Sequence, residues 1–134
     1  MVIIIAENKK GKVITLTKVG IIAGSIRKDS VSKKIGEKVG EMFPQGFEAR
    51  MIEIGNLPHY NEDIDVEGST PAEYTSFRNT LREMDAILFV TPEYNRSIPG
   101  VLKNAIDVGS RPYGASSWDG KPAAIISHDL IPVK

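Results

Sequence analysis

Two segments of the sequence combine side chains that could hold a ligand. The first, residues 24–30, is a polar loop between a short apolar run and a helical pattern. Backbone N–H groups at a helix start, the hydroxyls of Ser25 and Ser30, and the Arg27 guanidinium are donors suited to a phosphate. The alternative is an ordinary polar turn that caps the next helix. The loop lacks the glycine spacing of a dinucleotide-binding fingerprint or of a Walker loop.

The second segment, residues 91–100, follows another apolar run and contains Pro92 and Pro99. In an open α/β sheet, ligands bind beyond the carboxyl ends of the strands, where the winding reverses. With strand order 2-1-3-4-5, the loops after the first and third strands face one crevice. The prolines make this segment stiff, its backbone groups could hold a planar polar ring, and Tyr94 offers an aromatic face. The alternative is a plain strand-to-helix connection, and helix initiation is a sufficient reason for Pro99.

Apolar runs alternate with helical patterns along the chain, which is typical of an α/β protein. Runs without alternation indicate strands buried on both faces of a parallel sheet. The predicted strands are residues 19–23, 47–54, 86–90 and 123–126. The predicted helices are residues 31–43, 71–84 and 99–109.

Helix-start signals precede the first two of these helices. Either Asp29 or Ser30 is suited to cap the first helix. Thr70 and Glu73 have the spacing of a capping box, with Pro71 at the first helical position. We therefore expect the second helix to begin with a side-chain cap from Thr70.

The two ends of the chain depart from a regular doubly wound domain. Residues 1–17 are predicted to form an added hairpin, with strands at 2–5 and 13–17, ahead of a domain spanning 18–134. The sequence stops soon after the fourth apolar run, so the fifth strand and last helix are expected to be missing and the strand order to be 2-1-3-4. An exposed apolar edge at strand four favours association. We expect the hairpin, the tail or a partner subunit to cover it.

Composition excludes several classes of site. The chain has 134 residues, with 17 Lys and Arg against 17 Asp and Glu, so no net charge draws it to nucleic acid or to a membrane. It has no cysteine, which excludes disulfides, zinc–thiolate sites and a cysteine nucleophile. His59 and His128 are too few for a histidine-rich metal site and are interpreted as surface or turn residues. A cytoplasmic location is expected, because the apolar start is too short for a signal peptide or a membrane span.

Charge is distributed unevenly along the chain. Residues 1–50 carry ten basic and five acidic side chains, and residues 51–134 carry seven and twelve. Solvated helix faces account for this pattern, and a basic region that receives an anionic ligand is the weaker alternative. The acidic segment 62–67 is interpreted as a solvated loop.

Together these motifs resemble the NADPH-dependent FMN reductase family, a flavodoxin-like group that includes quinone, chromate and azo-dye reductases. The resemblance rests on GSIRKDS at 24–30, TPEYN at 91–95 and IPGVLKNAID at 98–107. It covers about residues 17–127, including matches at 57–63 and 120–122. It implies a flavodoxin-like fold.

The resemblance also assigns roles to individual residues. It implies that Ser25, Arg27 and Ser30 hold the FMN phosphate, with Ser32 at a position where the family usually has asparagine. Contacts to the ribityl chain and the isoalloxazine ring are implied for the second loop, at Pro92, Glu93, Tyr94 and Asn95, with Ser97 as a further contact. Arg27 or Lys28 could instead meet the 2′-phosphate of NADPH. The family's glycine-rich third flavin loop has no counterpart, because residues 128–134 contain no glycine.

The implied activity is an FMN-dependent oxidoreductase that takes hydride from NADPH or NADH. The implied acceptor is a quinone, an azo compound, free flavin or a metal oxyanion. The cofactor supplies this chemistry, so no catalytic side chain and no metal site are expected. The implied assembly is a homodimer or homotetramer. The alternative is a truncated flavin- or nucleotide-binding or association module without turnover.

Overall fold

The computed structural model describes residues 16–129, in which strands and helices alternate. The strands are β1 (Thr17–Ala23), β2 (Phe47–Met51), β3 (Ala86–Pro92) and β4 (Ala123–His128). The helices are α1 (Val31–Glu41), α2 (Ala72–Glu83) and α3 (Gly100–Gly109), and a short 3₁₀ helix, η1 (Glu62–Ile64), precedes α2. The predicted α/β alternation is confirmed.

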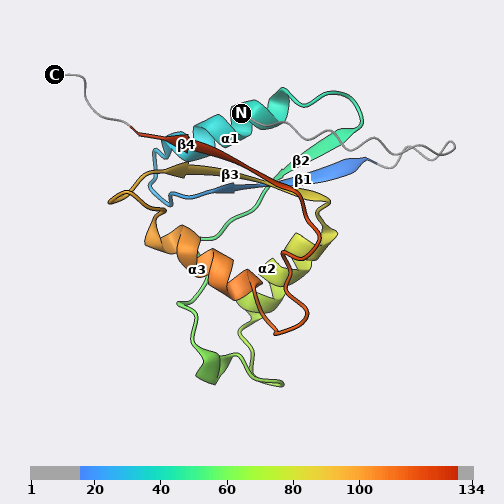
Figure 1. Ribbon diagram of the computed structural model, residues 1–134, viewed down its shortest axis with the longest axis vertical. Helices are drawn as coiled ribbons and strands as arrows, with labels where there is room; N and C mark the ends of the chain where they lie inside the picture. Colours follow the sequence, from blue (N-terminus) through green and yellow to red (C-terminus); the bar gives the residue numbers. More distant parts are fainter. Residues whose placement is uncertain (1–15, 130–134) are drawn as a thin grey trace, which may run out of the picture.

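The four strands form one parallel sheet in the order β2-β1-β3-β4, which confirms the predicted strand order. Ala23 is paired with Val90 at the ends of β1 and β3, and Pro92 is paired with His128 at the ends of β3 and β4. The carboxyl ends of these three strands therefore lie at one end of the sheet. The loops that follow β1 and β3 leave from that end (Figure 1).

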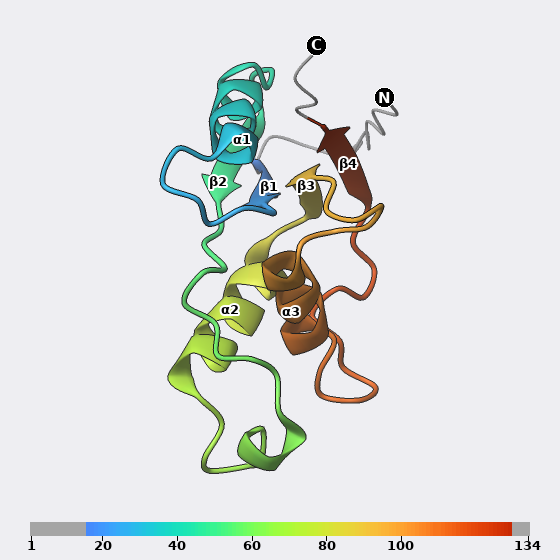
Figure 2. The same ribbon diagram turned by 90° about the vertical axis from the view of Figure 1, so that its left-hand side faces the viewer.

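Helices cover both faces of the sheet: α1 lies on one face, and α2 and α3 lie on the other (Figure 2). Alternate residues of the central strands pack into the two layers. Leu88 and Val90 of β3 pack on the side of Ile35 and Val39 from α1. Ile87 belongs to the larger cluster that α2 and α3 bury. Two apolar layers thus hold β1 and β3 in the middle of the molecule.

The start of α1 confirms one of the two predicted caps. The Ser30 side chain accepts a hydrogen bond from the Lys33 backbone N–H at 3.1 Å, as an N-cap residue does. The helix ends at Glu41, with Met42 as its C-cap, two residues earlier than predicted.

The predicted capping box at α2 is wrong. The Thr70 hydroxyl donates to the Val66 carbonyl oxygen at 3.0 Å, so it is directed back into the preceding loop. Pro71 occupies the N-cap position, and no side chain caps the helix. The local spacing rule failed here because the hydrogen bond to Val66 fixes the Thr70 side chain toward the loop, and its oxygen accepts from no N–H at the start of α2.

The predictions for β2 and β4 also need correction. The second strand ends at Met51 instead of residue 54, and Ile52 and Ile54 turn into the core cluster next to α2. β4 was expected to be a buried strand, but exposed and half-buried residues alternate along it, and Ile125 is 68% exposed. Ala124 and Ile126 pack with the cluster that α1 covers, whereas Ile125 points to the opposite face, where α2 and α3 leave it uncovered. The expected edge position of this strand is confirmed.

The predicted N-terminal hairpin lies outside the described residues, apart from Leu16 and Thr17. Thr17 begins β1, so it does not end a separate hairpin strand. Across residues 16–129, no helix is long and apolar enough to span a membrane.

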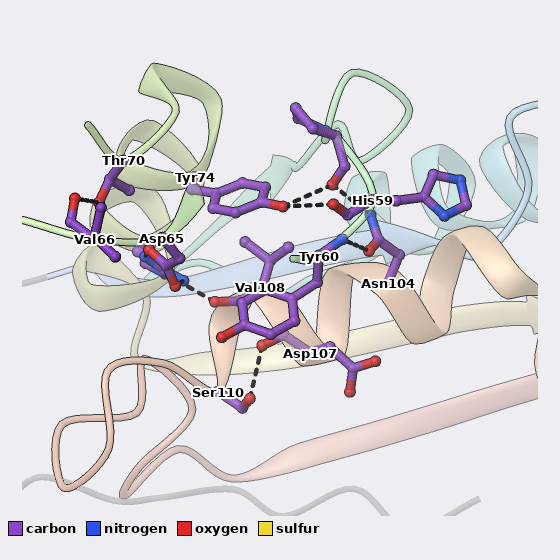
Figure 3. Close-up of polar contacts among 12 residues, drawn as sticks. His59, Tyr60, Asp65, Val66, Thr70, Tyr74, Asn104, Asp107, Val108 and Ser110 are labelled. Atoms are coloured by element: carbon purple, nitrogen blue, oxygen red, sulfur yellow. Dashed lines mark hydrogen bonds and ion pairs between the residues drawn. The ribbon is translucent and has the colours of Figure 1, made fainter. Parts of the chain in front are cut away.

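The long connection between β2 and α2 is pinned to both α2 and α3 (Figure 3). The Tyr74 hydroxyl donates to the carbonyl oxygens of Pro58 and His59, at 3.2 and 2.9 Å. The Asn104 side-chain oxygen accepts from the Tyr60 backbone N–H at 2.7 Å. These contacts fix residues 58–60, which belong to no helix or strand.

A buried ion pair provides a further anchor for this connection. Arg78 of α2 makes two hydrogen bonds to the Asp65 carboxylate, at 2.8 and 2.6 Å, and its Nε donates to the Val108 carbonyl oxygen at 2.8 Å. The two side chains are only 7% and 9% exposed. The interpretation of segment 62–67 as a solvated loop is therefore wrong for Asp65. Hydrogen bonds from Arg78 lower the pKa of this carboxyl group, although its burial opposes the shift.

We predict that Asp65→Ala lowers the free energy of unfolding by about 3 kcal/mol, because it leaves a buried guanidinium without its counter-ion. Denaturant unfolding measures the change. Glu67→Ala, at an exposed acidic position in the same segment, serves as the control and should change stability by less than about 0.5 kcal/mol. An Asp65→Leu/Arg78→Met double variant should recover most of the loss. Equal effects for the Asp65 and Glu67 variants would contradict the prediction.

The same pair predicts a pH dependence of stability. The folded-state pKa of Asp65 lies below its ordinary value of 3.8, so the unfolded state binds the proton more tightly. The stabilisation is fully present above that ordinary value and is lost as pH falls through the lowered pKa. The difference in unfolding free energy between the wild type and Asp65→Ala should be constant near neutral pH and shrink below about pH 4. A difference that grows on acidification would contradict this.

Candidate functional site

A hollow of about 200 Å³ lies at the carboxyl end of the sheet, where three strands end together. Residues after β1, residues at the end of β3 and beyond, and the end of β4 form its walls. The lining residues are Ser25, Arg27, Ser30, Val31, Ser32, Pro92, Glu93, Tyr94, His128 and Asp129. Segments that are distant in the sequence therefore meet at one site.

The first wall is the loop from β1 to α1. Ser25 Oγ accepts from the Arg27 backbone N–H at 3.4 Å, and the Ser30 backbone N–H donates to the Arg27 carbonyl oxygen at 3.0 Å. The Ser30 side chain is also the cap of α1. The positive end of the α1 dipole and the Arg27 guanidinium are thus on the same side of the hollow. Within residues 16–129, Arg27 takes part in no ion pair.

The second wall is the segment after β3. The Glu93 backbone N–H donates to the His128 carbonyl oxygen at 3.1 Å, which ties this segment to β4. Tyr94 and Ser97 exchange two backbone hydrogen bonds, at 2.8 and 3.0 Å, across a tight turn. The two residues inside the turn, Asn95 and Arg96, have positive φ angles of 52° and 62°. The turn leaves Tyr94 52% exposed at the hollow.

Seven of the nine residues with predicted binding roles line the hollow: Ser25, Arg27, Ser30, Ser32, Pro92, Glu93 and Tyr94. Asn95 and Ser97 do not line it. Both belong to the exposed turn beyond Tyr94. Roles in cofactor binding stay predictions for all nine residues.

The third wall includes His128, which the sequence analysis interpreted as a surface or turn residue. It is instead the last residue of β4, half-buried, and its Nε2 lies 2.7 Å from Ser32 Oγ. The interpretation was wrong because it considered the imidazole alone. Its place directly after a predicted strand, like that of the other site residues, is a signal that could have identified it.

The lining groups combine donors with two carboxylates. Arg27, three serine hydroxyls and the start of α1 are donors, whereas Glu93 and Asp129 are acidic. The donors are suited to an anion, and Tyr94 presents an apolar ring face beside them. Chemically, the site can bind a molecule that joins an anionic group to a flat apolar part.

The chain is similar to several known oxidoreductases. A protein named quinone reductase from Pseudomonas putida KT2440 is 53% identical over 109 residues, which cover 81% of this chain and 58% of that protein. A 2-hydroxy-1,4-benzoquinone reductase from a Burkholderia species is 44% identical, with the same coverage. The solved structure of FerB, a flavoenzyme NAD(P)H:(acceptor) oxidoreductase from Paracoccus denitrificans, superposes with a TM-score of 0.77 at 42% identity. It covers 84% of this chain and 60% of FerB.

The chain therefore spans somewhat over half the length of the curated relatives it matches. The match to the family covers most of this chain. Residues 17–129 match NADPH-dependent FMN reductases, including both loops that line the hollow. The chain belongs to the NADPH-dependent FMN reductase family.

Proposed function

We propose that the hollow binds the phosphate end of FMN and that the protein is an NAD(P)H-dependent oxidoreductase acting on quinones. The observation that carries this proposal is the group of Ser25, Arg27, Ser30 and Ser32 around the start of α1. This donor set suits a phosphate monoester, and family membership supports FMN as the molecule that carries it.

The size of the hollow agrees with one end of the cofactor. Pockets for whole cofactors measure about 300–1,000 Å³, and this one measures about 200 Å³. It suits the phosphate and the adjoining ribityl chain, with the ring beyond them near Tyr94. Ser25, Arg27, Ser30 and Ser32 would hold the phosphate, and Pro92, Glu93 and Tyr94 would contact the remainder. Asn95 and Ser97 would contribute from the turn beyond Tyr94.

When bound, FMN supplies hydride transfer between a nicotinamide and an acceptor. The residues of this chain bind and orient. The Arg27 charge offsets the carboxylates of Glu93 and Asp129, which disfavour an anion at the same hollow. The stiff segment after β3 holds Tyr94 at the opening. No side chain of this chain is assigned a proton-transfer step.

A quinone acceptor is proposed because two relatives, the Pseudomonas quinone reductase and the Burkholderia 2-hydroxy-1,4-benzoquinone reductase, are named for quinone reduction. Use of either NADPH or NADH is proposed because FerB is described as an NAD(P)H oxidoreductase. A binding module without turnover is the second candidate, and the activity assay below separates the two.

We further propose that the protein is cytoplasmic and assembles as a homodimer or homotetramer. Support for assembly comes from β4, an edge strand on which Ile125 is 68% exposed. Edge strands and exposed apolar surface favour association. Light scattering of the purified protein tests the assembly, and a monodisperse monomer would contradict it.

We predict that Arg27→Gln weakens FMN binding by about 10- to 100-fold, because it removes a charge-assisted hydrogen bond to the phosphate. Flavin fluorescence titration measures the affinity. Riboflavin has the same ring without the phosphate, so its affinity should not change. Lys28→Gln is the matched control, since Lys28 is exposed beside the same loop and does not line the hollow. Equal losses for both variants, or for both flavins, would contradict the assigned role.

We also predict that the FMN-loaded protein oxidises NADPH or NADH faster when a benzoquinone is added. Absorbance at the nicotinamide band follows the reaction, with protein lacking FMN as the blank. Flavin binding without nicotinamide oxidation would favour the binding module. Failure to bind FMN would exclude both the FMN-dependent oxidoreductase and the FMN-binding module.

A further inference from the structure

Two of the three serines of the hollow share one hydrogen-bond pattern, and the third differs. Ser25 Oγ accepts from the Arg27 backbone N–H, and Ser30 Oγ accepts from the Lys33 backbone N–H. A hydroxyl that already accepts keeps its own hydrogen free to donate. Ser25 and Ser30 can therefore direct their hydrogens at an anion. Within residues 16–129, Ser32 Oγ has no such backbone donor, and it lies 2.7 Å from His128 Nε2 instead.

The direction of the Ser32–His128 hydrogen bond decides what Ser32 can do. If Ser32 donated to Nε2, its only hydrogen would be used and an anion would meet a hydroxyl that can only accept. If Nε2–H donates to Ser32, the hydroxyl hydrogen is available to the hollow. Ser32 is only 1% exposed, so water is a poor substitute partner for it.

The second ring nitrogen of His128 favours the latter direction. Nδ1 is buried and has no hydrogen-bond partner among residues 16–129. A buried N–H without an acceptor is rare and costly, whereas an under-satisfied acceptor is better tolerated. The neutral ring should therefore carry its hydrogen on Nε2 and leave Nδ1 as an unprotonated acceptor.

From this geometry we infer that His128 is a positioning residue that turns Ser32 into a hydrogen-bond donor for a phosphate monoester in the hollow. The Ser32 hydroxyl then matches those of Ser25 and Ser30, and three hydroxyl hydrogens converge on one anion. This inference rests on the proposed function for the identity of the anion as FMN. The hydrogen-bond direction itself does not depend on any ligand.

The tautomer can be measured on the unaltered protein. Long-range ¹H–¹⁵N NMR spectra, recorded at about pH 8.5 where imidazoles are neutral, distinguish a protonated ring nitrogen from an unprotonated one. The chain has two histidines, so a His59→Gln variant assigns the signals, and the exposed His59 is an internal reference. We expect His128 to carry its hydrogen on Nε2. A hydrogen on Nδ1 would overturn the inference.

The role in binding is tested with a double-mutant cycle. His128→Phe keeps a ring but removes both nitrogens, and it should weaken FMN binding about tenfold while leaving riboflavin binding unchanged. In a Ser32→Ala background, the same substitution should cause no further loss. His128→Gln restores a donor near the position of Nε2 and should recover most of the affinity. Thermal melting of each variant verifies that it is folded.

Each outcome of the cycle has one meaning. A loss that persists in the Ser32→Ala background, or that affects riboflavin equally, would overturn the positioning role. If His128→Phe does not fold, the comparison of His128→Gln with Ser32→Ala decides the matter, since only Ser32→Ala should lose affinity. If the wild type binds neither FMN nor inorganic phosphate, the proposed function fails together with the anion-binding role of Ser32. The tautomer result would still report the direction of the hydrogen bond.

Discussion

The hollow depends on the parallel pairing that brings the carboxyl ends of β1, β3 and β4 to the same level. The Gly24 backbone N–H donates to the Val90 carbonyl oxygen at 2.8 Å, so the loop leaves β1 directly against β3. A Cβ atom at position 24 would lie 2.6 Å from Thr91 Oγ1 and 3.0 Å from Leu102 Cδ2. Any side chain here would therefore displace Thr91 of β3 or Leu102 of α3. Because Gly24 has no side chain, the first two walls stay close enough to contact one ligand.

Features that arise from neighbouring residues were predictable from the sequence. Apolar runs identified the four strands, and their alternation with amphipathic helices predicted the parallel sheet, whereas the strand order came from the flavodoxin-like arrangement. The Ser30 cap was predictable because its partner, the Lys33 N–H, is three residues away. Seven predicted site residues converge because they lie between β1 and the first turn of α1 or at or just after the end of β3, and β1 and β3 are neighbours.

Features that depend on contacts outside the regular helix and strand patterns were not predictable. Thr70 has the spacing of a cap, but its hydroxyl donates to the Val66 carbonyl oxygen of a loop without a regular pattern. Asp65 reads as one acid among several, and only the fold shows that its carboxylate accepts two hydrogen bonds from Arg78, which also donates to the Val108 carbonyl oxygen. The hydrogen-bond partner of His128 is Ser32, 96 residues earlier in the chain. The contacts of Asp65 and His128 are tertiary and have no local signature, whereas the Thr70 contact is local but lies in a loop without a regular pattern.

The ends of three strands form the hollow, so ligand binding there is coupled to folding of the sheet. If only β1 and the loop after it were folded, the hollow would have one of its three walls. His128 can contact Ser32 only after β4 has paired with β3. A ligand bound there recognises the folded state alone and stabilises it by mass action, by about 2.7 kcal/mol at a hundred times its dissociation constant. Saturating ligand should thus suppress the sub-global opening in which β4 detaches from β3. Amide exchange along β4 would then slow although the ligand contacts only the end of that strand.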